Sequence, residues 1–262
     1  MIKNPYSFQA VRVLNFYDET AIDRTYELEW NDPVVLGQFF EVSIPGAGEA
    51  PISISDYRDG VLYMTIRKVG RVTDAIFQKE IGGRLYLRGP YGNGFAMDRL
   101  KGSAVTVIAG GTGLAPVRGL IERLSLECSD GLELLAGFKS PDDVLFKSTL
   151  DRWQERFPVH VTVDHGSDQW KGKTGLVTQY IPDLRLDNGV SRKVIVVGPP
   201  IMMKFVTLEL MKQGLDESDI IVSFERNMSC GIGKCGHCKI DETYVCLEGP
   251  VFAYSKAKHL ID

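Results

Sequence analysis

The chain has 262 residues, a formal net charge of −4 and 44% hydrophobic residues, the composition of an ordinary soluble globular protein, and its length predicts more than one domain. No stripe of lysine and arginine is present to neutralise phosphates, which argues against a nucleic-acid partner. The apolar runs are strand-length, shorter than the roughly 20 residues of a membrane helix, and residues 1–5 lack the apolar core of a signal peptide, so we expect a cytoplasmic location without a membrane span.

Residues 1–99 are predicted to form an antiparallel β-barrel. Short strands at regular spacing, separated by turn-forming residues, are typical of that architecture. The predicted strands are residues 8–16, 37–43, 60–66 and 83–89. A short helix is expected at residues 72–78, between the third and fourth of them.

Residues 100–222 have a different pattern, in which apolar strands alternate with helices. Such alternation predicts a doubly wound parallel sheet, whose strands are buried on both faces. The predicted strands are residues 104–109, 132–137, 159–163, 194–197 and 220–224, and the predicted helices are residues 116–126, 142–157 and 202–213. Residues 223–262 are short, irregular and rich in cysteine, and we expect them to form a third, small domain.

Four of the five cysteines are concentrated in this last segment. They are Cys230, Cys235, Cys238 and Cys246. The spacing C-x4-C-x2-C with a separated fourth cysteine is the plant-type ferredoxin spacing for a 2Fe–2S cluster. Thiolates are soft ligands that suit such clusters, and glycines between them let backbone amides approach the sulfurs. The pattern therefore predicts a 2Fe–2S centre.

A structural zinc site is the alternative interpretation of the four cysteines. Zinc sites usually carry two pairs of closely spaced ligands, whereas this segment has one such pair and an isolated Cys246. The spacing therefore favours the iron–sulfur cluster. His237 lies between two ligands and is interpreted as a neighbour rather than a ligand, and Cys128 as a small packed apolar residue.

Two loops are candidates for binding a dinucleotide. The first is Gly110-Gly111-Thr112-Gly113, between a strand and a helix, and the second is Gly198-Pro199-Pro200, after another strand. Glycines permit close approach of a pyrophosphate, and ligands of doubly wound sheets bind at the carboxyl ends of strands. The first loop departs from G-x-G-x-x-G, so a purely structural turn is the alternative for it taken alone.

Two weaker patterns lie in the predicted barrel. One is Pro51-Ile52-Ser53, and the other is Gly70 to Thr73 at the start of the predicted helix. Each is also compatible with an ordinary strand or helix cap. Arg67, Arg71 and Thr73 are candidates to meet a pyrophosphate at the start of that helix.

The order of these motifs resembles the ferredoxin–NADP reductase superfamily, and the cysteines resemble those of its iron–sulfur flavoprotein branch. That branch includes electron-transfer subunits of dihydroorotate dehydrogenase, gamma subunits of sulfhydrogenases and B subunits of anaerobic sulfite reductases. Several stretches are similar to the last group. They are residues 48–57, 88–94, 197–202, 233–238, 244–246 and 249–252.

The resemblance implies FAD in the barrel and NAD(H) in the sheet domain. In the superfamily motif R-x-[YF]-S, the serine meets the reactive edge of the flavin, and here Ser53 matches it. Ala50 and Ile52 replace the arginine and the aromatic residue, and Arg67 is the candidate substitute for the arginine. The resemblance also assigns Gly70 and Thr73 to the flavin. It assigns Gly110, Gly111, Thr112 and Gly113 to the nicotinamide nucleotide.

The resemblance further implies an electron-transfer subunit that passes electrons from NADH through FAD and the cluster. The expected partners are a catalytic subunit that reduces sulfite to sulfide and a further iron–sulfur subunit. Lys139 would suit the 2′-phosphate of NADPH, whereas Asp142 or Asp143 would disfavour it, and the resemblance favours NADH.

Two alternatives remain open for the function. The first is the same electron-transfer role in a dihydroorotate dehydrogenase or a sulfhydrogenase. The second is a zinc-bearing binding module with a vestigial reductase fold, which the missing arginine at position 50 keeps possible.

Overall fold

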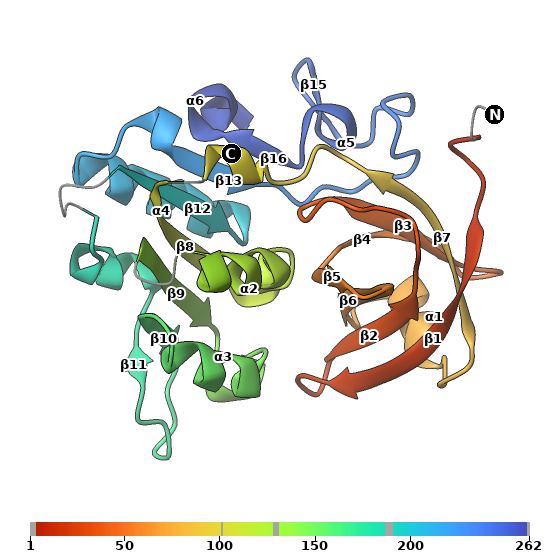
Figure 1. Cartoon of the computed structure of the whole chain (residues 1–262), viewed down its shortest axis with the longest axis horizontal. Coiled ribbons are helices and arrows are strands. Elements are labelled where there is room, and N and C mark those ends of the chain that lie inside the picture. The colour runs from red at the N-terminus through yellow and green to blue at the C-terminus, as the bar shows by residue number, and fades with distance from the viewer. Residues whose placement is uncertain (1–3, 101, 128–130, 187–190, 261–262) are drawn as a thin grey trace. The chain divides into compact units, whose positions relative to one another are not determined.

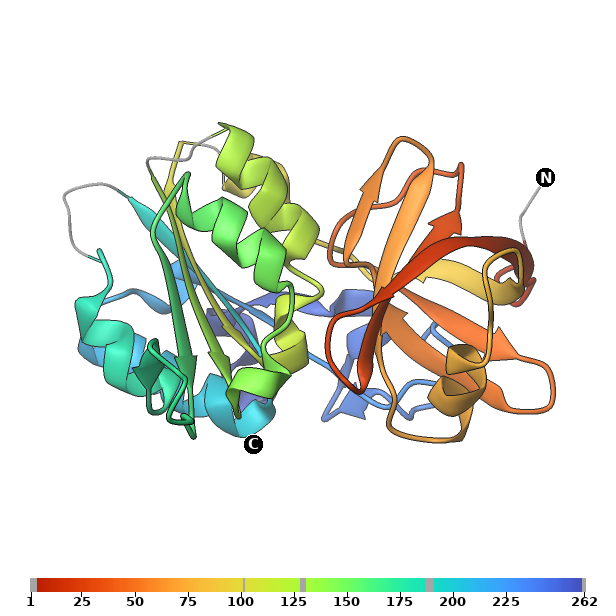
Figure 2. The same ribbon diagram turned by 90° about the horizontal axis from the view of Figure 1, so that it is seen from below.

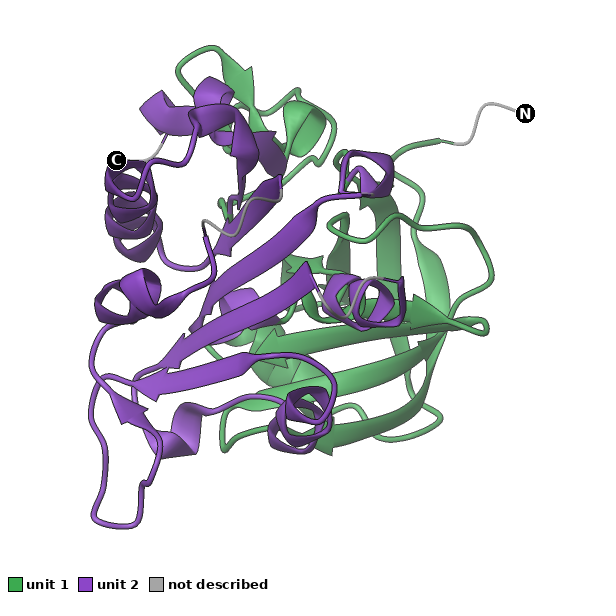
Figure 3. Cartoon of the chain, turned by 60° about the vertical axis from the view of Figure 1, so that its left-hand side comes forward, with its two compact units in different colours: residues 1–95, 115–119, 225–250 green, residues 96–114, 120–224, 251–262 purple. Residues whose placement is uncertain are grey.

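The computed structural model describes residues 4–100, 102–127, 131–186 and 191–260, and its contacts divide the chain into two compact units (Figure 3). The first unit contains residues 1–95, 115–119 and 225–250, and the second contains residues 96–114, 120–224 and 251–262. Cys128 lies outside the described residues. No helix within the described ranges is long and apolar enough to cross a membrane.

A seven-stranded antiparallel sheet forms most of the first unit (Figure 1). Its strands, in the spatial order β4-β3-β7-β1-β2-β6-β5, are β1 (Gln9–Asp18), β2 (Asp23–Glu29), β3 (Phe39–Ile44), β4 (Gly48–Ser53), β5 (Asp56–Arg58), β6 (Val61–Arg67) and β7 (Arg84–Tyr91). Side chains from alternate positions fill one core, in which the rings of Trp30 and Phe40 meet edge to face with centroids 4.8 Å apart. Helix α1 (Arg71–Phe77) follows β6 and buries Ile76.

Strand pairing does not close this sheet into the expected barrel. Among the described residues no ladder joins the edge strands β4 and β5. Only Ile54 and Ser55 separate these two strands, and β4 pairs with β3 whereas β5 pairs with β6. The amide of Ile54 bonds Gln38 O at 3.0 Å and that of Ser55 bonds Tyr63 O at 2.9 Å, so this corner links β3 to β6 instead.

The second unit is built on the predicted doubly wound sheet. Its strands, in the order β11-β10-β9-β8-β12-β13-β16, are β8 (Ala104–Gly110), β9 (Leu132–Phe138), β10 (Val159–Val163), β11 (Lys173–Thr174), β12 (Arg192–Val197), β13 (Ile220–Ser223) and β16 (Val251–Ala253). All neighbours are parallel except β13 and β16. Every residue of β8 and β9 is buried, because helices cover both faces.

The helices of the second unit lie on opposite faces of this sheet (Figure 2). Helices α2 (Arg118–Glu127) and α3 (Lys147–Gln154) lie on one face, and α4 (Pro200–Lys212) lies on the other. The chain moves outward from β8 in one direction to β9 and β10, then returns and moves the other way through β12 and β13. Right-handed crossovers in opposite directions place helices on opposite faces.

Helix α3 is shorter than the sequence pattern suggests. We expected a helix over residues 142–157, but Pro141–Asp143 form a 3₁₀ turn and α3 begins at Lys147. Phe146 precedes the helix in the left-handed conformation, with φ of 56°, and its buried side chain explains why the chain accepts this backbone. Strands β2, β5, β11 and β16 were also not anticipated.

The cysteine-rich segment is more regular than expected. It contains a hairpin of β14 (Lys239–Ile240) and β15 (Thr243–Tyr244), followed by the single turn α5 (Val245–Glu248). Residues 225–250 group with the first unit, whereas β16 and α6 (Tyr254–Ala257) group with the second. The consecutive boundaries 1–99, 100–222 and 223–262 remain a prediction.

Candidate functional site

Backbone amides of the cysteine loop point at cysteine sulfurs. The amides of Ile232, Lys234 and Cys235 lie 3.4, 3.3 and 3.4 Å from Cys230 Sγ. The amide of Gly233 donates to Cys246 Sγ at 3.1 Å. Gly231, Gly233 and Gly236 have φ between 68° and 82°, a conformation that turns successive amides inward and favours glycine. The loop therefore presents several donors to two of the predicted ligand sulfurs.

Three of the four cysteines lie in a shielded environment. Cys230, Cys238 and Cys246 are buried, and Cys235 is exposed. Burial raises the pKa of Cys246 to about 12, with the Cys238 thiol adding to the effect, so this group is a neutral thiol unless a metal displaces its proton. The pKa of the exposed Cys235 is lowered, chiefly by a backbone hydrogen bond from His237.

This donor set fits an iron–sulfur cluster. Soft thiolates shielded from water, with amide N–H groups directed at sulfur, are the features that hold such clusters and set their potential. Cys230, Cys235, Cys238 and Cys246 would be the ligands. The described residues contain no group of three or more His, Cys, Asp or Glu side chains arranged to hold a single metal ion.

Strand β7 and the residues after it hold this loop within the first unit. The Arg88 guanidinium donates to Cys230 O at 2.6 Å and to Ser229 O. Asn93 binds the other side of the loop, its amide donating to Gly249 O at 2.7 Å and its side chain to Glu248 O at 2.9 Å. No sequence pattern marks Arg88 or Asn93 as functional, because only the fold shows that this part of the chain contacts the cysteine segment.

Tyr91 packs directly against the cysteine loop. A Cβ on Gly231 would lie 2.6 Å from the Tyr91 ring, so only glycine allows this approach. The Tyr91 hydroxyl donates to Pro5 O and accepts from Arg88 at 3.1 Å. The ring of Phe8 lies 5.7 Å from the Arg88 guanidinium. The N-terminal segment and the cysteine loop thus meet the same two side chains of β7.

The two predicted dinucleotide loops lie side by side in the second unit. Strands β8 and β12 are parallel neighbours, with Val107 opposite Ile195 and Ala109 opposite Val197, so the loops that follow them share one edge. A Cβ on Gly113 would lie 2.6 Å from Val197 O, which shows how closely the two loops approach. The structure therefore brings Gly110–Gly113 and Gly198–Pro200 together where doubly wound sheets bind ligands.

Gly111 is open to solvent on the side where a Cβ would project. Its φ is 54°, and no heavy atom lies within 4 Å of a Cβ built there. The neighbouring Thr112 belongs to the short 3₁₀ turn Gly111–Leu114. Gly198 is half-buried, and Pro199 and Pro200 are exposed. These residues leave room for a pyrophosphate above the strand ends, so they fit a dinucleotide.

The residues considered for choosing between NADH and NADPH lie after β9. Lys139 and Asp142 are exposed, whereas Asp143 accepts a hydrogen bond from Ser140 Oγ at 2.6 Å. Asp143 is therefore used in the 3₁₀ turn, which leaves Lys139 and Asp142 as the exposed charges of this loop.

The predicted flavin residues Pro51, Ile52 and Ser53 lie on the edge strand β4 and are half-buried. Ser53 stands opposite Phe39 of β3. Within the part of the chain that the structure describes, no protein partner bonds the Ser53 hydroxyl, which suits a residue that meets a ligand. Ala50 also lies on this strand, so an arginine here would have occupied the same edge.

Gly70 and Thr73 form the start of α1. The Thr73 hydroxyl accepts the amides of Val69 and Gly70 at 2.9 and 3.1 Å and donates to Gly70 O. Thr73 is therefore occupied with capping its own helix. The Arg71 guanidinium donates to Gly46 O in the turn between β3 and β4.

Arg67 has a strong protein partner. Its Nε and Nη2 donate to the two carboxylate oxygens of Asp23 at 2.8 and 2.9 Å, and Asp23 is fully buried. Thr20 donates a further bond to Asp23 at 2.6 Å. Arg67 thus neutralises a buried carboxylate. It could also bind the flavin pyrophosphate only if its guanidinium contacted Asp23 and the pyrophosphate together.

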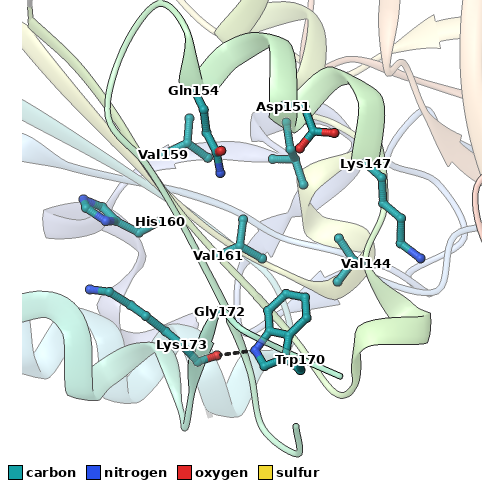
Figure 4. Close-up of a pocket in the computed structure, with 11 residues that line it drawn as sticks. Val144, Lys147, Asp151, Gln154, Val159, His160, Val161, Trp170, Gly172 and Lys173 are labelled. Carbon is teal, nitrogen blue, oxygen red and sulfur yellow. Dashed lines mark hydrogen bonds between the residues drawn. The ribbon is translucent and has the colours of Figure 1, made fainter. Parts of the chain in front are cut away.

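A shallow cavity of about 480 Å³ lies elsewhere in the second unit (Figure 4). Helix α3, the first half of β10 and residues 170–173 line it, and Trp170 Nε1 donates to Lys173 O at 3.0 Å. Its charged lining residues include Lys147, Asp151 and Lys173. None of the residues predicted from the sequence to bind a cofactor lines this cavity, and it lies by the beginning of β10 rather than at the carboxyl ends of the strands.

Comparison with known protein families identifies two domains, in the two regions that contain these sites. Residues 107–207 match an oxidoreductase NAD-binding domain, and residues 225–258 match the iron–sulfur cluster binding domain of dihydroorotate dehydrogenase B. The sulfhydrogenase 1 subunit gamma of Pyrococcus furiosus is 34% identical over 273 residues, covering 96% of this chain and 92% of the relative. The chain belongs to this family of NAD-dependent electron-transfer subunits.

A second member of the family is named for a different enzyme. A probable dihydroorotate dehydrogenase B (NAD(+)) electron transfer subunit of Thermoplasma acidophilum is 34% identical over 238 residues, covering 90% of this chain and 85% of the relative. These family members are subunits of larger oxidoreductases. The chain is accordingly an NAD-dependent oxidoreductase subunit with an iron–sulfur domain.

The fold agrees with this family. An NADH-dependent reduced ferredoxin–NADP oxidoreductase, solved in work on flavin-based electron bifurcation, superposes with a TM-score of 0.76 over 95% of this chain and 90% of that chain, at 22% identity. At this identity the likeness shows the fold alone. It confirms the predicted order of an antiparallel sheet domain, a parallel nucleotide-binding sheet and a C-terminal iron–sulfur segment.

Proposed function

We propose that this subunit takes electrons from NADH, passes them through a bound FAD to a 2Fe–2S cluster, and delivers them to a catalytic partner. The observation that carries the proposal is the position of the cysteine loop. Residues 225–250 form one compact unit with the sheet that bears Ser53, so the predicted flavin and cluster motifs belong to the same unit. The iron–sulfur domain match favours a cluster over the zinc-bearing alternative.

The chain's own residues place and shield the cofactors rather than react. When bound, FAD accepts a hydride from NADH and releases electrons singly to the cluster. Gly110–Gly113 and Gly198–Pro200 provide the nucleotide loops, and Ser53 lies on the flavin strand. Cys230, Cys238 and Cys246 are buried, so three of the four predicted ligand positions are shielded from water. The exposed Cys235 marks the side from which we propose that electrons leave toward the partner.

The finer proposal is that the partner reduces sulfite to sulfide, together with a further iron–sulfur subunit. Similarity of residues 48–57 and 233–238 to B subunits of anaerobic sulfite reductases supports it. The curated relatives support two other acceptors, because their names are those of sulfhydrogenase and dihydroorotate dehydrogenase subunits. Cytoplasmic location also remains a prediction from the sequence.

Spectroscopy of the purified protein tests the electron-transfer proposal. The oxidised protein is expected to show flavin and 2Fe–2S absorption that bleaches on addition of NADH under anaerobic conditions. A colourless protein that contains one zinc ion and no flavin would contradict this function.

Purification of the native complex tests the acceptor. Oxidation of NADH by the complex is measured with sulfite, orotate or elemental sulfur as the electron acceptor in separate reactions. Sulfite-dependent oxidation with release of sulfide supports the finer proposal. A partner that binds flavin mononucleotide and converts dihydroorotate to orotate would instead assign the chain to a dihydroorotate dehydrogenase.

A further inference from the structure

We propose that Arg88 holds the cluster loop in position and that Arg88 and Glu41 act on the reduction potential of the cluster in opposite directions. This inference rests on the proposed electron-transfer function and concerns residues that are not cluster ligands. It is carried by the hydrogen bonds of Arg88, the burial of both side chains and their positions on neighbouring strands.

The Arg88 side chain is a buried clamp with four partners. It is 3% exposed. It donates to Cys230 O at 2.6 Å, to Ser229 O, to Glu49 Oε2 at 2.7 Å and to the Tyr91 hydroxyl at 3.1 Å. A planar guanidinium with five donors can satisfy partners in several fixed directions, which the single ammonium of lysine does not. The geometry therefore depends on arginine in particular.

The bonds to Ser229 and Cys230 have a specific consequence for the loop. They fix the carbonyl groups at and before the first cysteine, whereas the amides that follow are directed at Cys230 Sγ. Holding these carbonyls sets the orientation of the chain as it enters the amide turn. Arg88 is thus a positioning residue for the hydrogen bonds to sulfur, which are among the factors that set cluster potentials.

Glu41 lies across from Arg88 in the sheet. The register of β3 and β7 places Glu41 opposite Arg88, and Glu41 is fully buried. Neither carboxylate oxygen of Glu41 has a hydrogen-bond partner within the described residues. A buried carboxylate without hydrogen-bond partners is costly, so Glu41 lowers the stability of the folded protein. Its place beside the cluster loop suggests an electrostatic purpose.

Arg88 connects Glu41 to the cysteine loop, because it stands opposite Glu41 in the sheet and donates to Cys230 O. Burial raises the pKa of Glu41 to about 7, Arg88 opposes this rise, and the charges of Glu49 and Cys230 add to it. Glu41 and Cys230 are thus both neighbours of the same arginine. In a shielded environment, charges interact more strongly than they do in water.

Reduction of a 2Fe–2S cluster by one electron adds one negative charge. A fixed positive charge at Arg88 stabilises the reduced cluster and raises its potential, whereas the Glu41 carboxylate opposes reduction and lowers it. Removal of the Arg88 charge should therefore lower the potential, and removal of the Glu41 charge should raise it. A merely structural role for both residues predicts no such opposition.

The experiment is a redox titration of the full-length holoprotein with dithionite at pH 8.5, above the raised pKa of Glu41. The EPR signal of the reduced cluster reports its midpoint potential. The variants are Arg88→Gln, Arg88→Lys and Glu41→Gln, and the control is Arg84→Gln, which removes the same charge from an exposed position on β7. Iron and acid-labile sulfide are measured on each preparation.

We expect Arg88→Gln to lower the potential, so that the ratio of reduced to oxidised cluster at the wild-type midpoint falls about tenfold, or 59 mV for one electron. Arg88→Lys should shift it less, and Glu41→Gln should raise it. Shifts no larger than that of Arg84→Gln, or shifts of the same sign in Arg88→Gln and Glu41→Gln, overturn the inference.

Three further outcomes are decisive. If Arg88→Gln loses the cluster, the midpoint potential of Glu41→Gln becomes the test. An unchanged potential in Glu41→Gln then overturns the inference. If the wild-type protein itself shows no 2Fe–2S signal, the proposed electron-transfer function fails and this inference fails with it. A normal wild-type cluster with unresponsive variants overturns the inference alone.

Discussion

The sulfur of Met202 occupies the space into which a side chain on Gly110 would project. A Cβ on Gly110 would lie 2.1 Å from Met202 Sδ, and one on Gly198 would lie 2.8 Å from the same atom. One thioether on α4 therefore packs against both dinucleotide loops. A side chain at either position would therefore have to displace the Met202 thioether, before any demand of a bound nucleotide is considered.

Substitution of Gly110 by alanine is expected to destabilise the fold, because the new methyl group overlaps Met202. Overpacking of this kind costs about 1–3 kcal/mol in the free energy of unfolding. Urea denaturation followed by fluorescence measures it. The additional change Met202→Ala should recover part of the loss, and a double variant no more stable than Gly110→Ala would contradict this contact.

Substitution of Gly111 by valine tests the nucleotide loop with less disturbance of the packing. The Gly111 side is open, so the cost arises mainly from a left-handed backbone, about 1–3 kcal/mol for a residue other than glycine. We expect at least a tenfold rise in the NADH concentration needed for flavin reduction, because the new side chain fills the space left for the pyrophosphate. Stopped-flow absorption measures the reduction, and the cluster content should remain that of the wild type.

Substitution of Cys246 by serine is expected to remove or weaken the cluster while NADH still reduces the flavin. The serine hydroxyl is a poor ligand for iron, and the hydrogen bond from the Gly233 amide to the Cys246 sulfur is also lost. Iron content and the EPR signal measure the cluster, and stopped-flow absorption measures flavin reduction. Cys128→Ser is the control, since that cysteine lies outside the spacing motif. Equal loss of the cluster and of flavin reduction in Cys246→Ser would indicate a structural role for the segment.

The order of strands and helices was predictable where periodicity is strong. The apolar strands β8, β9 and β12 and the glycine loops after two of them follow directly from the sequence, because parallel strands are buried on both faces. Strand β16 was not predictable in this way. Its three residues become a strand only because they pair with β13, a tertiary contact that a local pattern does not show.

The surroundings of the cysteines were also beyond the sequence. The spacing of Cys230, Cys235 and Cys238 was sufficient to predict a cluster, because the ligand chemistry is local. Arg88 and Glu41 lie far earlier in the chain and appeared as ordinary strand residues. Only the pairing of β3 with β7, and the return of the chain to β7, makes them neighbours of the cysteine loop.

Substitution of Glu41 by glutamine should change how stability depends on pH. Burial raises the pKa of Glu41 from 4.5 to about 7 in the folded protein. Between these values the folded state holds a proton that the unfolded state releases, so this group's contribution to stability falls as the pH rises and levels off above about pH 7. Arg88, Glu49 and Cys230 are the groups that face it.

Glutamine mimics the protonated carboxyl and removes this dependence. Relative to the wild type, Glu41→Gln should gain stability from pH 5 to pH 8, by up to about 3 kcal/mol. Urea midpoints at several pH values measure the difference, with Glu49→Gln as the partly exposed control. A difference between Glu41→Gln and the wild type that stays constant with pH would show that Glu41 keeps an ordinary pKa.

Arg67 and Asp23 offer a way to separate flavin binding from folding. Arg67→Gln alone leaves the buried Asp23 without its cation, which costs about 3–5 kcal/mol for a buried pair. Loss of FAD from that variant would then have two explanations. The double variant Asp23→Asn with Arg67→Gln removes both charges and should recover most of the stability.

The double variant decides whether Arg67 also contacts FAD. If its guanidinium is shared with the pyrophosphate, the double variant should be stable in urea yet bind FAD at least tenfold more weakly, as measured by fluorescence on titration of the apoprotein. The single variant Asp23→Asn, which keeps Arg67 and removes only the carboxylate at position 23, is the matched control and should bind FAD at least as well as the wild type. Wild-type FAD affinity in a stable double variant would assign Arg67 to the fold alone, and the replacement for the arginine missing at position 50 would then lie elsewhere, with Arg71 as the next residue to test.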